Sequence, residues 1–455
     1  MTAVCPHRPG DYVERFTGRG TEAELVCEDC AANRLPAFPA SDEAVQYARD
    51  SIRVRFEGDP ELVELPSELA FAHETIELYV PDLVDLRALG ADDRSRWIGV
   101  TGDGALVEVD LDRRSVRALA RVAIPAPVEL HVSPSGAFAA VVEARGVRGE
   151  IVELATDRRI PLERDGYHSD AGRFPFAFVT HRDREAAIYA PEWNRLAAFD
   201  LRTGEALTAR ATPPAGDQHY LDYFHAGLQV SPGGTMIADS GWAWAPFGVV
   251  ATWSLERWLD DHPWESEDGR SRRDFSWRES WDLPLCWIDD ARLIIGGHGD
   301  IGATYDAAVD IYDARSGKLE RWFAGPEAGA ELVFDRVLFA LGRELEVYDV
   351  ERGGRLARDP HVTARYHPSA KCFATLPRER RITISRLRGL DAHAPWATET
   401  VRALAASITD HERELPVLGD ALDDAGCTDA EMLAHCRKPG PHGASCWVLD
   451  RLARR

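Results

Sequence analysis

A short phrase recurs along the chain, and it constrains the fold more than any other feature. It alternates apolar and polar residues, reaches an Asp or a related residue, and then turns through Arg with Gly or Ser; the clearest copies are residues 106–119, 196–209, 308–322 and 344–357. Alternation with a period of two is typical of a strand buried on one face. In the turns that follow, Gly204 and Gly317 are suited to positive φ. The phrase therefore predicts a strand followed by a hairpin.

Weaker copies of the phrase complete a series of seven units. The equivalent positions are Asp110, Leu154, Asp200, Ser254, Asp313, Asp349 and Ser385. Successive positions are 36 to 59 residues apart, which leaves room for about four strands in each unit. Repeated units of four short strands are the pattern of a β-propeller. We predict a mainly β protein built as a seven-bladed β-propeller.

The upstream halves of three units share a Pro turn between two strands, at residues 131–142, 229–240 and 365–376. Together with the Asp-ended strands, these turns resemble WD repeats over residues 90–390. This chain departs from the WD pattern, because no unit has a Gly-His pair early in the blade or a Trp-Asp pair at the position of the recurring Asp. The Cys/His-rich head and the tail also resemble a bacterial family. The resemblances imply a propeller fold and no particular activity.

The composition changes along the chain and suggests four parts. We expect a zinc knuckle over residues 1–40, a linker with a blade-closing strand over 41–90, the propeller over 91–390 and a helical segment over 391–455. Propellers avoid free sheet edges by closing the ring. Thr75–Val80 has the alternation needed for a strand that completes the last blade.

The head carries four potential metal ligands, Cys5, His7, Cys27 and Cys30. The pattern is C-x-H followed by C-x-x-C, and four Cys/His ligands suit a closed tetrahedral zinc site. Residues 12–18 and 23–27 are expected to form a hairpin that brings the two halves together. A segment this short needs a metal or another cross-link to fold. The opening C-x-H resembles ubiquitin-protease-type zinc fingers. We predict structural zinc here; the alternative is a set of reduced cysteines.

The tail is predicted to be helical, because Leu415, Leu418 and Leu422 have helical spacing. Thr428 and Glu431 are spaced as a capping box. The tail also contains Cys427, His435, Cys436, His442 and Cys446, whose spacing resembles RNA-binding zinc fingers. An apolar helix around Cys436 and the scarcity of cations favour buried cysteines over a second metal site.

Several propeller loops mix histidines with aromatic residues. Such loops supply binding hot spots, or they support large loops from within the core. The candidates for a binding face are His168, His219, Tyr220, Tyr223, His225, Trp242, Trp244, His298 and Tyr305. Residues 258–277 form a polar, charged insertion, predicted to be a surface excursion or a partner-docking loop.

The formal net charge of −23 opposes binding to nucleic acid and to anionic membranes. An N-terminus without a basic and an apolar region, together with unpaired Cys286 and Cys372, predicts a cytoplasmic protein. The sequence contains no P-loop and no G-x-S-x-G motif. We predict a non-catalytic scaffold that binds a protein or a peptide. The alternatives are a metal-dependent hydrolase or lactonase acting at the central face, and a sensor of a small ligand.

Overall fold

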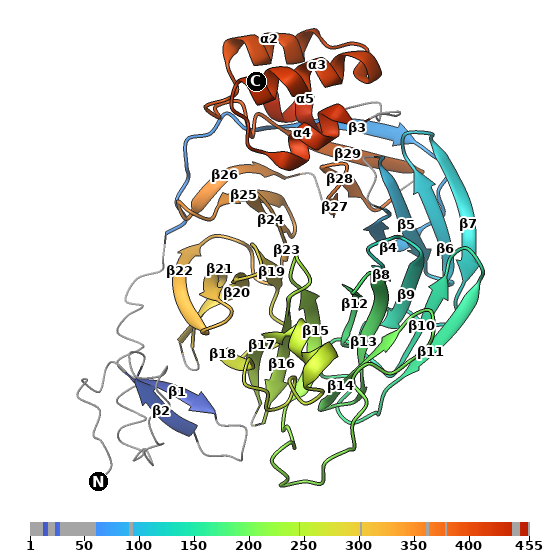
Figure 1. The fold of residues 1–455 in the computed structure, drawn as a ribbon, viewed down its shortest axis with the longest axis vertical. Coiled ribbons are helices and arrows are strands. Elements are labelled where there is room, and N and C mark those ends of the chain that lie inside the picture. The colour runs from blue at the N-terminus through green and yellow to red at the C-terminus, as the bar shows by residue number, and fades with distance from the viewer. Residues whose placement is uncertain are drawn as a thin grey trace.

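The computed structural model describes residues 61–453, apart from 91–93, 245, 301–302, 361–363, 378–379 and 439–445, and the backbone of two strands nearer the N-terminus. In this part of the chain, seven small antiparallel sheets form a ring, with helices at one rim (Figure 1). The seven-bladed propeller is therefore confirmed. None of the helices in this part of the chain is long and apolar enough to cross a bilayer.

The first three blades follow one another along the chain. Blade 1 comprises β4 (Leu83–Ala88), β5 (Arg96–Thr101), β6 (Ala105–Asp110) and β7 (Ser115–Arg121). Blade 2 comprises β8 (Val128–Val132), β9 (Phe138–Glu143), β10 (Arg148–Glu153) and β11 (Arg158–Glu163). Blade 3 comprises β12 (Phe176–His181), β13 (Arg184–Glu192) and β14 (Arg195–Asp200).

The remaining blades each contain four strands. Blade 4 comprises β15 (Phe224–Val230), β16 (Met236–Ala243), β17 (Phe247–Ser254) and β18 (Arg273–Arg278). Blade 5 comprises β19 (Leu285–Trp287), β20 (Arg292–Asp300), β21 (Ala303–Asp313) and β22 (Lys318–Ala324). Blade 6 comprises β23 (Glu331–Asp335), β24 (Val337–Leu341), β25 (Leu345–Asp349) and β26 (Gly354–Asp359). Blade 7 comprises β27 (Ala364–His367), β28 (Cys372–Thr375), β29 (Arg381–Arg388) and β3 (Ala70–Glu77).

The recurring Asp has a structural role at the end of the third strand of a blade. The carboxylate of Asp200 accepts hydrogen bonds from the backbone N–H of Arg202 at 2.9 Å and of Thr203 at 2.7 Å, and Asp313 accepts one from Ser316 N–H at 2.7 Å. These bonds stabilise the tight turn to the next strand. Gly204 follows with φ +73°, a conformation that glycine adopts without strain. The predicted hairpin turn is confirmed.

Two details of the predicted repeat are wrong. Ser385 lies inside β29 rather than at its end, because this strand continues to Arg388. Blade 3 has three regular strands instead of four. The segment after β14 lies along the edge of that strand without forming a regular fourth strand. It contacts β14 through an isolated bridge between Phe199 and Ala206 and a hydrogen bond from Ala198 N–H to the Thr208 hydroxyl at 3.0 Å.

The ring closes through β3, a strand from before the first blade. It pairs antiparallel with β29 over its whole length, in a register that places Ile76 opposite Ile382. The predicted closing strand is confirmed, although it begins earlier and ends at Glu77 rather than Val80. Residues 61–69 also reach blade 6, where Leu65 N–H donates to Arg355 O at 2.8 Å. The segment that precedes blade 1 thus contacts both blade 6 and blade 7.

A helical cap lies over blades 6 and 7. It consists of α2 (Glu399–Ser407), α3 (His411–Asp424), α4 (Ala430–Arg437) and α5 (Trp447–Leu452). The predicted Leu415, Leu418 and Leu422 are fully buried in its core. The predicted capping box is wrong: Asp429 caps α4, and its carboxylate accepts from Met432 N–H at 3.0 Å.

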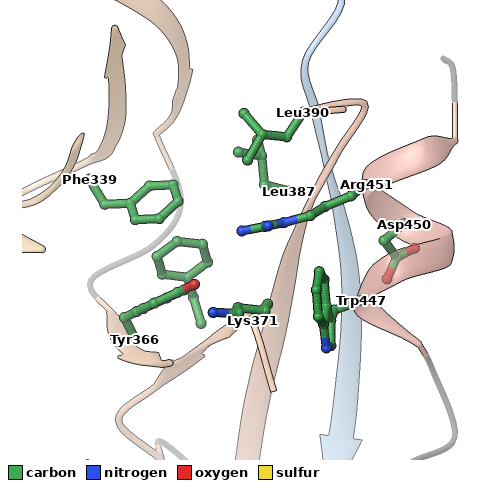
Figure 2. A pocket seen from close by; sticks show the side chains of 9 residues that line it. Phe339, Tyr366, Lys371, Leu387, Leu390, Trp447, Asp450 and Arg451 are labelled. Atoms are coloured by element: carbon green, nitrogen blue, oxygen red, sulfur yellow. The ribbon is translucent and has the colours of Figure 1, made fainter. Parts of the chain in front are cut away.

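Buried ion pairs attach the cap to the propeller. Figure 2 shows Arg451 of α5 beside Trp447 and Lys371, and the guanidinium carbon of Arg451 lies 4.9 Å from the Trp447 ring centroid. Arg451 donates to Asp335 at 3.2 Å, and Lys371 Nζ lies 3.0 Å from the same carboxylate. The pocket that these side chains line has a volume of about 10 Å³, close to the minimum for one water molecule. The contact is tightly packed.

The insertion at residues 258–277 combines buried and exposed residues. It begins within a π-helical turn, η3 (Arg257–Asp261), and its last residues belong to β18. Trp258, Glu265 and Ser266 are almost fully buried. The Glu265 carboxylate accepts from Ser271 N–H at 2.8 Å. The insertion is therefore an excursion that lies only partly at the surface: Asp261, Asp268 and Arg270 are exposed, whereas residues such as Glu265 are buried in the fold.

Candidate functional site: an aromatic patch on blades 3 and 4

One face of the propeller gathers a cluster of aromatic side chains, which we call the aromatic patch. It consists of Tyr167, His168, Trp193, Tyr220, Phe224, Trp242, Trp244 and Trp281. Six of them come from loops between blades or from turns between second and third strands, whereas Phe224 begins β15 and Trp242 lies near the end of β16. Because successive strands alternate in direction, all these segments emerge on the same face. The helical cap contacts turns between first and second strands, and so it lies toward the opposite face.

The patch has a buried base and an exposed rim. Phe224 and Trp242 form the base, stacked with ring centroids 3.7 Å apart and both almost fully buried. Tyr167 is 52% exposed and Trp244 is 37% exposed. The ring of His168 bridges to the rim, with its centroid 5.2 Å from that of Trp244. Large aromatic surfaces in solvent on a packed base are typical of binding hot spots.

Hydrogen bonds fix the loops that carry the rim. The carboxylate of Asp165 accepts from Tyr167 N–H at 3.2 Å and from Trp193 N–H at 3.0 Å. Trp281 Nε1–H donates to Ala171 O at 2.8 Å. His168 has φ +51°, a conformation that costs free energy for a residue other than glycine and that often occurs at functional sites. The patch is thus preorganised, which reduces the entropy lost on binding.

The structure brings together four of the predicted binding-face residues, His168, Tyr220, Trp242 and Trp244. The centroid of Tyr220 lies 6.5 Å from that of Trp193. Sequence reasoning did not single out Tyr167, Trp193, Phe224 or Trp281. A usable signal was present for Trp193, which precedes Asn194 in a short turn between two alternating segments.

The other predicted residues lie elsewhere or inside the fold. Tyr223 and His225 are buried, and His225 Nδ1 lies 2.5 Å from the Asp239 carboxylate. His298 is buried too, 2.5 Å from Asp310, and it stands opposite Tyr305 in the β20–β21 register. His219 stacks on Trp264 with centroids 4.3 Å apart, outside the patch. We do not include these residues in the site.

The first strands of the blades surround the axis, and their side chains carry paired charges. Arg87 Nη1 lies 2.9 Å from Glu331, and Arg365 Nε lies 3.1 Å from Asp85. Burial raises the pKa of Asp85, but the guanidinium groups of Arg87 and Arg365 outweigh it and leave the pKa below its usual value. This network links blades 1, 6 and 7.

A second charged group lies on blade 2, where the Glu129 carboxylate forms an ion pair with Arg173, with Arg173 Nε at 3.2 Å. Burial raises the pKa of Glu129 and lowers that of His131 to about 3. Shifts of this kind occur at catalytic centres and also in structural ion-pair networks. Here the carboxylate is held by an arginine, which favours the structural role.

The side chains of the four metal ligands predicted near the N-terminus lie outside the described part of the chain. Cys5, His7, Cys30 and the side chain of Cys27 are among the residues that the structure does not describe. The hairpin expected between them is confirmed: β1 (Tyr12–Phe16) pairs antiparallel with β2 (Ala23–Cys27), with Tyr12 opposite Cys27.

In the tail, Cys427, Cys436 and Cys446 are buried in the core of the cap. Burial raises the pKa of the Cys436 thiol to about 12. His435 Nδ1 accepts from Trp447 Nε1–H at 3.0 Å. His442 lies outside the described residues, and within the described part of the chain no three His, Cys, Asp or Glu side chains are placed to hold a metal ion.

Comparisons with known proteins concern the fold. No protein-family model and no curated protein matches the chain. Among solved structures, it is similar to a chain in a structure titled "Crystal Structure of Mitotic Checkpoint Complex", with 14% identity and a TM-score of 0.44. The match covers 68% of this chain and 92% of that chain. At 14% identity the similarity concerns the fold alone.

Proposed function

We propose that this protein is a non-catalytic, cytoplasmic platform that binds a protein or a peptide through the aromatic patch. The observation that carries the proposal is the exposed rim of Tyr167 and Trp244 on the rigid base of Phe224 and Trp242. Aromatic anchors of this size dominate the free energy of binding in protein interfaces. The preorganised loops favour binding further, because they lose little conformational entropy when a partner binds.

The test is the double variant Tyr167→Ala/Trp244→Ala. We expect it to keep its fold and to lose binding to its native partner by about 100-fold, since each truncated hot-spot aromatic costs about 1–2 kcal/mol or more. Binding is measured by quantitative capture from the native host, followed by titration of the enriched protein with the purified chain. The matched control is Tyr79→Ala, an aromatic that is 73% exposed and lies outside the patch. An equal loss of partner binding in Tyr167→Ala/Trp244→Ala and in Tyr79→Ala would contradict the proposal.

The hydrolase alternative requires carboxylates that are free to bind an ion or to activate water. The carboxylates around the axis are paired instead: Asp85 with Arg365, Glu331 with Arg87, and Glu129 with Arg173. Hydrolytic turnover that Glu129→Gln abolishes, with capture unaffected by the patch variant, would favour the enzyme. A sensor of a small ligand would instead show saturable binding of a metabolite at the patch.

We further propose that Cys5, His7, Cys27 and Cys30 bind one structural zinc ion. The β1–β2 hairpin supports this proposal, because its register places Tyr12 opposite Cys27. Elemental analysis of the purified protein is expected to find about one zinc per chain, falling to about zero in Cys27→Ser/Cys30→Ser. Cys286→Ser, a buried cysteine in blade 5, is the control and should retain the metal. A zinc-free wild-type protein would contradict the site.

A further inference from the structure

A pocket between blades 2 and 3 is separate from the aromatic patch. Its volume is about 320 Å³, which is within the range of small-molecule sites. Its lining side chains come from β11 on blade 2, and from β13, β14 and the turn after β14 on blade 3. β11 is an edge strand of its sheet, and the two blades are neighbours in the ring (Figure 1). The pocket therefore lies at the outer part of the contact between these blades.

The floor of the pocket is apolar. Leu162 is buried in the core between blades 2 and 3, whereas Ile160, Tyr189 and Phe199 pack against this core and remain partly exposed. The rings of Tyr189 and Phe199 meet edge to face, with centroids 6.1 Å apart. Blade 3 has no regular fourth strand to cover them. The floor thus offers aliphatic and aromatic surface to a ligand.

The rim of the pocket is positively charged. Arg158 and Arg202 line it, and no Asp or Glu of the described part of the chain does. This is notable in a chain with 76 acidic and 53 basic residues. Arg158 Nη2 donates to Leu201 O at 2.6 Å, and this bond connects Arg158 to the turn that carries Arg202. Because two cations line the pocket and no described carboxylate does, the rim complements an anion.

Both arginines retain donors for a ligand. Arg158 Nε donates to Glu153 at 3.0 Å, which together with the bond to Leu201 O holds the guanidinium in place. Its remaining terminal nitrogen, Nη1, donates to no residue that the structure describes. Arg202 is exposed and forms no ion pair with a carboxylate in the described part of the chain. Guanidinium groups bind carboxylates through charge-assisted hydrogen bonds.

We propose that this pocket binds a small organic molecule that has an apolar body and a carboxylate. The body lies on Ile160, Tyr189 and Phe199, and the carboxylate accepts hydrogen bonds from Arg158 and Arg202. Burial of the body supplies most of the affinity, and the arginines orient the ligand and select for its charge.

The pocket and the aromatic patch lie toward opposite faces of the propeller. Trp193 of the patch precedes the start of β14, whereas Arg202 follows its end at Asp200. A ligand in the pocket would not compete with a partner on the patch. The inference therefore goes beyond the platform function and does not depend on it.

The experiment titrates the full chain with three probes that share one apolar body: phenylbutyrate, phenylbutanamide and phenylbutylamine. The amide removes the negative charge, and the amine reverses it. Binding is followed by saturation-transfer NMR and titration calorimetry. We expect phenylbutyrate to bind about tenfold more tightly than the amide, because hydrogen bonds to charged groups are the stronger ones. The amine should bind most weakly.

The variants separate the local cation from the overall charge. Arg202→Met is expected to weaken phenylbutyrate about threefold, as for an exposed ion pair, and to leave the amide unchanged. Arg315→Met is the matched control, because Arg315 is exposed at the same position of the turn after β21 in blade 5. It should leave both affinities unchanged. Ile160→Ala removes apolar contact from the floor and should weaken all three probes.

Three results would overturn the inference: no saturable binding of phenylbutyrate, equal affinities for phenylbutyrate and its amide, or equal effects of Arg202→Met and Arg315→Met. The patch variant Tyr167→Ala/Trp244→Ala should bind phenylbutyrate as the wild-type protein does. Loss of that binding would place the ligand at the aromatic patch and would also contradict the inference. None of these results bears on capture of the native partner, which tests the platform function separately.

Discussion

Replacing Ile76 with Asp is expected to destabilise the whole propeller by about 4 kcal/mol or more. Ile76 is 3% exposed in β3 and packs with Trp97, Ile382 and Ile384 between blades 7 and 1. Truncating a buried Ile costs about 2–5 kcal/mol, and a buried carboxylate adds a desolvation penalty. Because β3 closes the ring, its loss exposes the edge of β29 and favours aggregation. Urea denaturation and gel filtration measure both effects.

The control for this prediction is the adjacent residue. Thr75 is exposed on the other face of β3, and its hydroxyl lies 3.3 Å from that of Thr383. Thr75→Asp is expected to change stability by less than about 1 kcal/mol. Ile76→Ala gives an intermediate loss if the Asp variant does not fold. Similar midpoints for Ile76→Asp and Thr75→Asp would show that β3 does not hold the ring closed.

The repeat was predictable because it is a local pattern. In six of the seven units the equivalent position falls at the end of a third strand or one residue beyond it, from Asp110 at the end of β6 to Asp349 at the end of β25. The Asp side chain and the turn that it stabilises are only two or three residues apart, so the sequence contains the whole interaction. The same holds for the Pro turn at Ser133–Gly136, where Gly136 has φ +74°.

The candidate site was only partly predictable because it depends on contacts distant in sequence. His225 looked like a loop residue, but an irregular register between β15 and β16 turns it toward Asp239 in the fold. Tyr167 and Trp244 lie in loops far apart in the sequence, and the ring of His168 links them only when the propeller is assembled. No period or spacing in the sequence specifies which loops share a face until the strand order is known.

Replacing Arg278 with Met is expected to cost about 3–5 kcal/mol of stability, because it leaves a buried carboxylate short of a partner. Arg278 is fully buried, and it donates to Asp310 at 2.7 Å and to Gly296 O at 2.6 Å. Asp310 is also buried and lies 2.5 Å from His298, so its charge has no access to water. The loss is measured as a shift in the urea midpoint.

A second substitution, Asp310→Asn, distinguishes the loss of a buried ion pair from a general effect of removing an arginine. Adding Asp310→Asn to Arg278→Met removes the uncompensated charge, and we expect more than half of the lost stability to return. Arg117→Met removes an arginine that is 72% exposed and paired with Glu108 in blade 1, and it should cost less than about 1 kcal/mol. If Arg278→Met cost no more than Arg117→Met, the carboxylate of Asp310 would not depend on its arginine. If the network is structural, as we expect, partner capture per folded molecule stays unchanged in Arg278→Met. This result would show that the buried network, which includes His298, takes no part in binding at the aromatic patch.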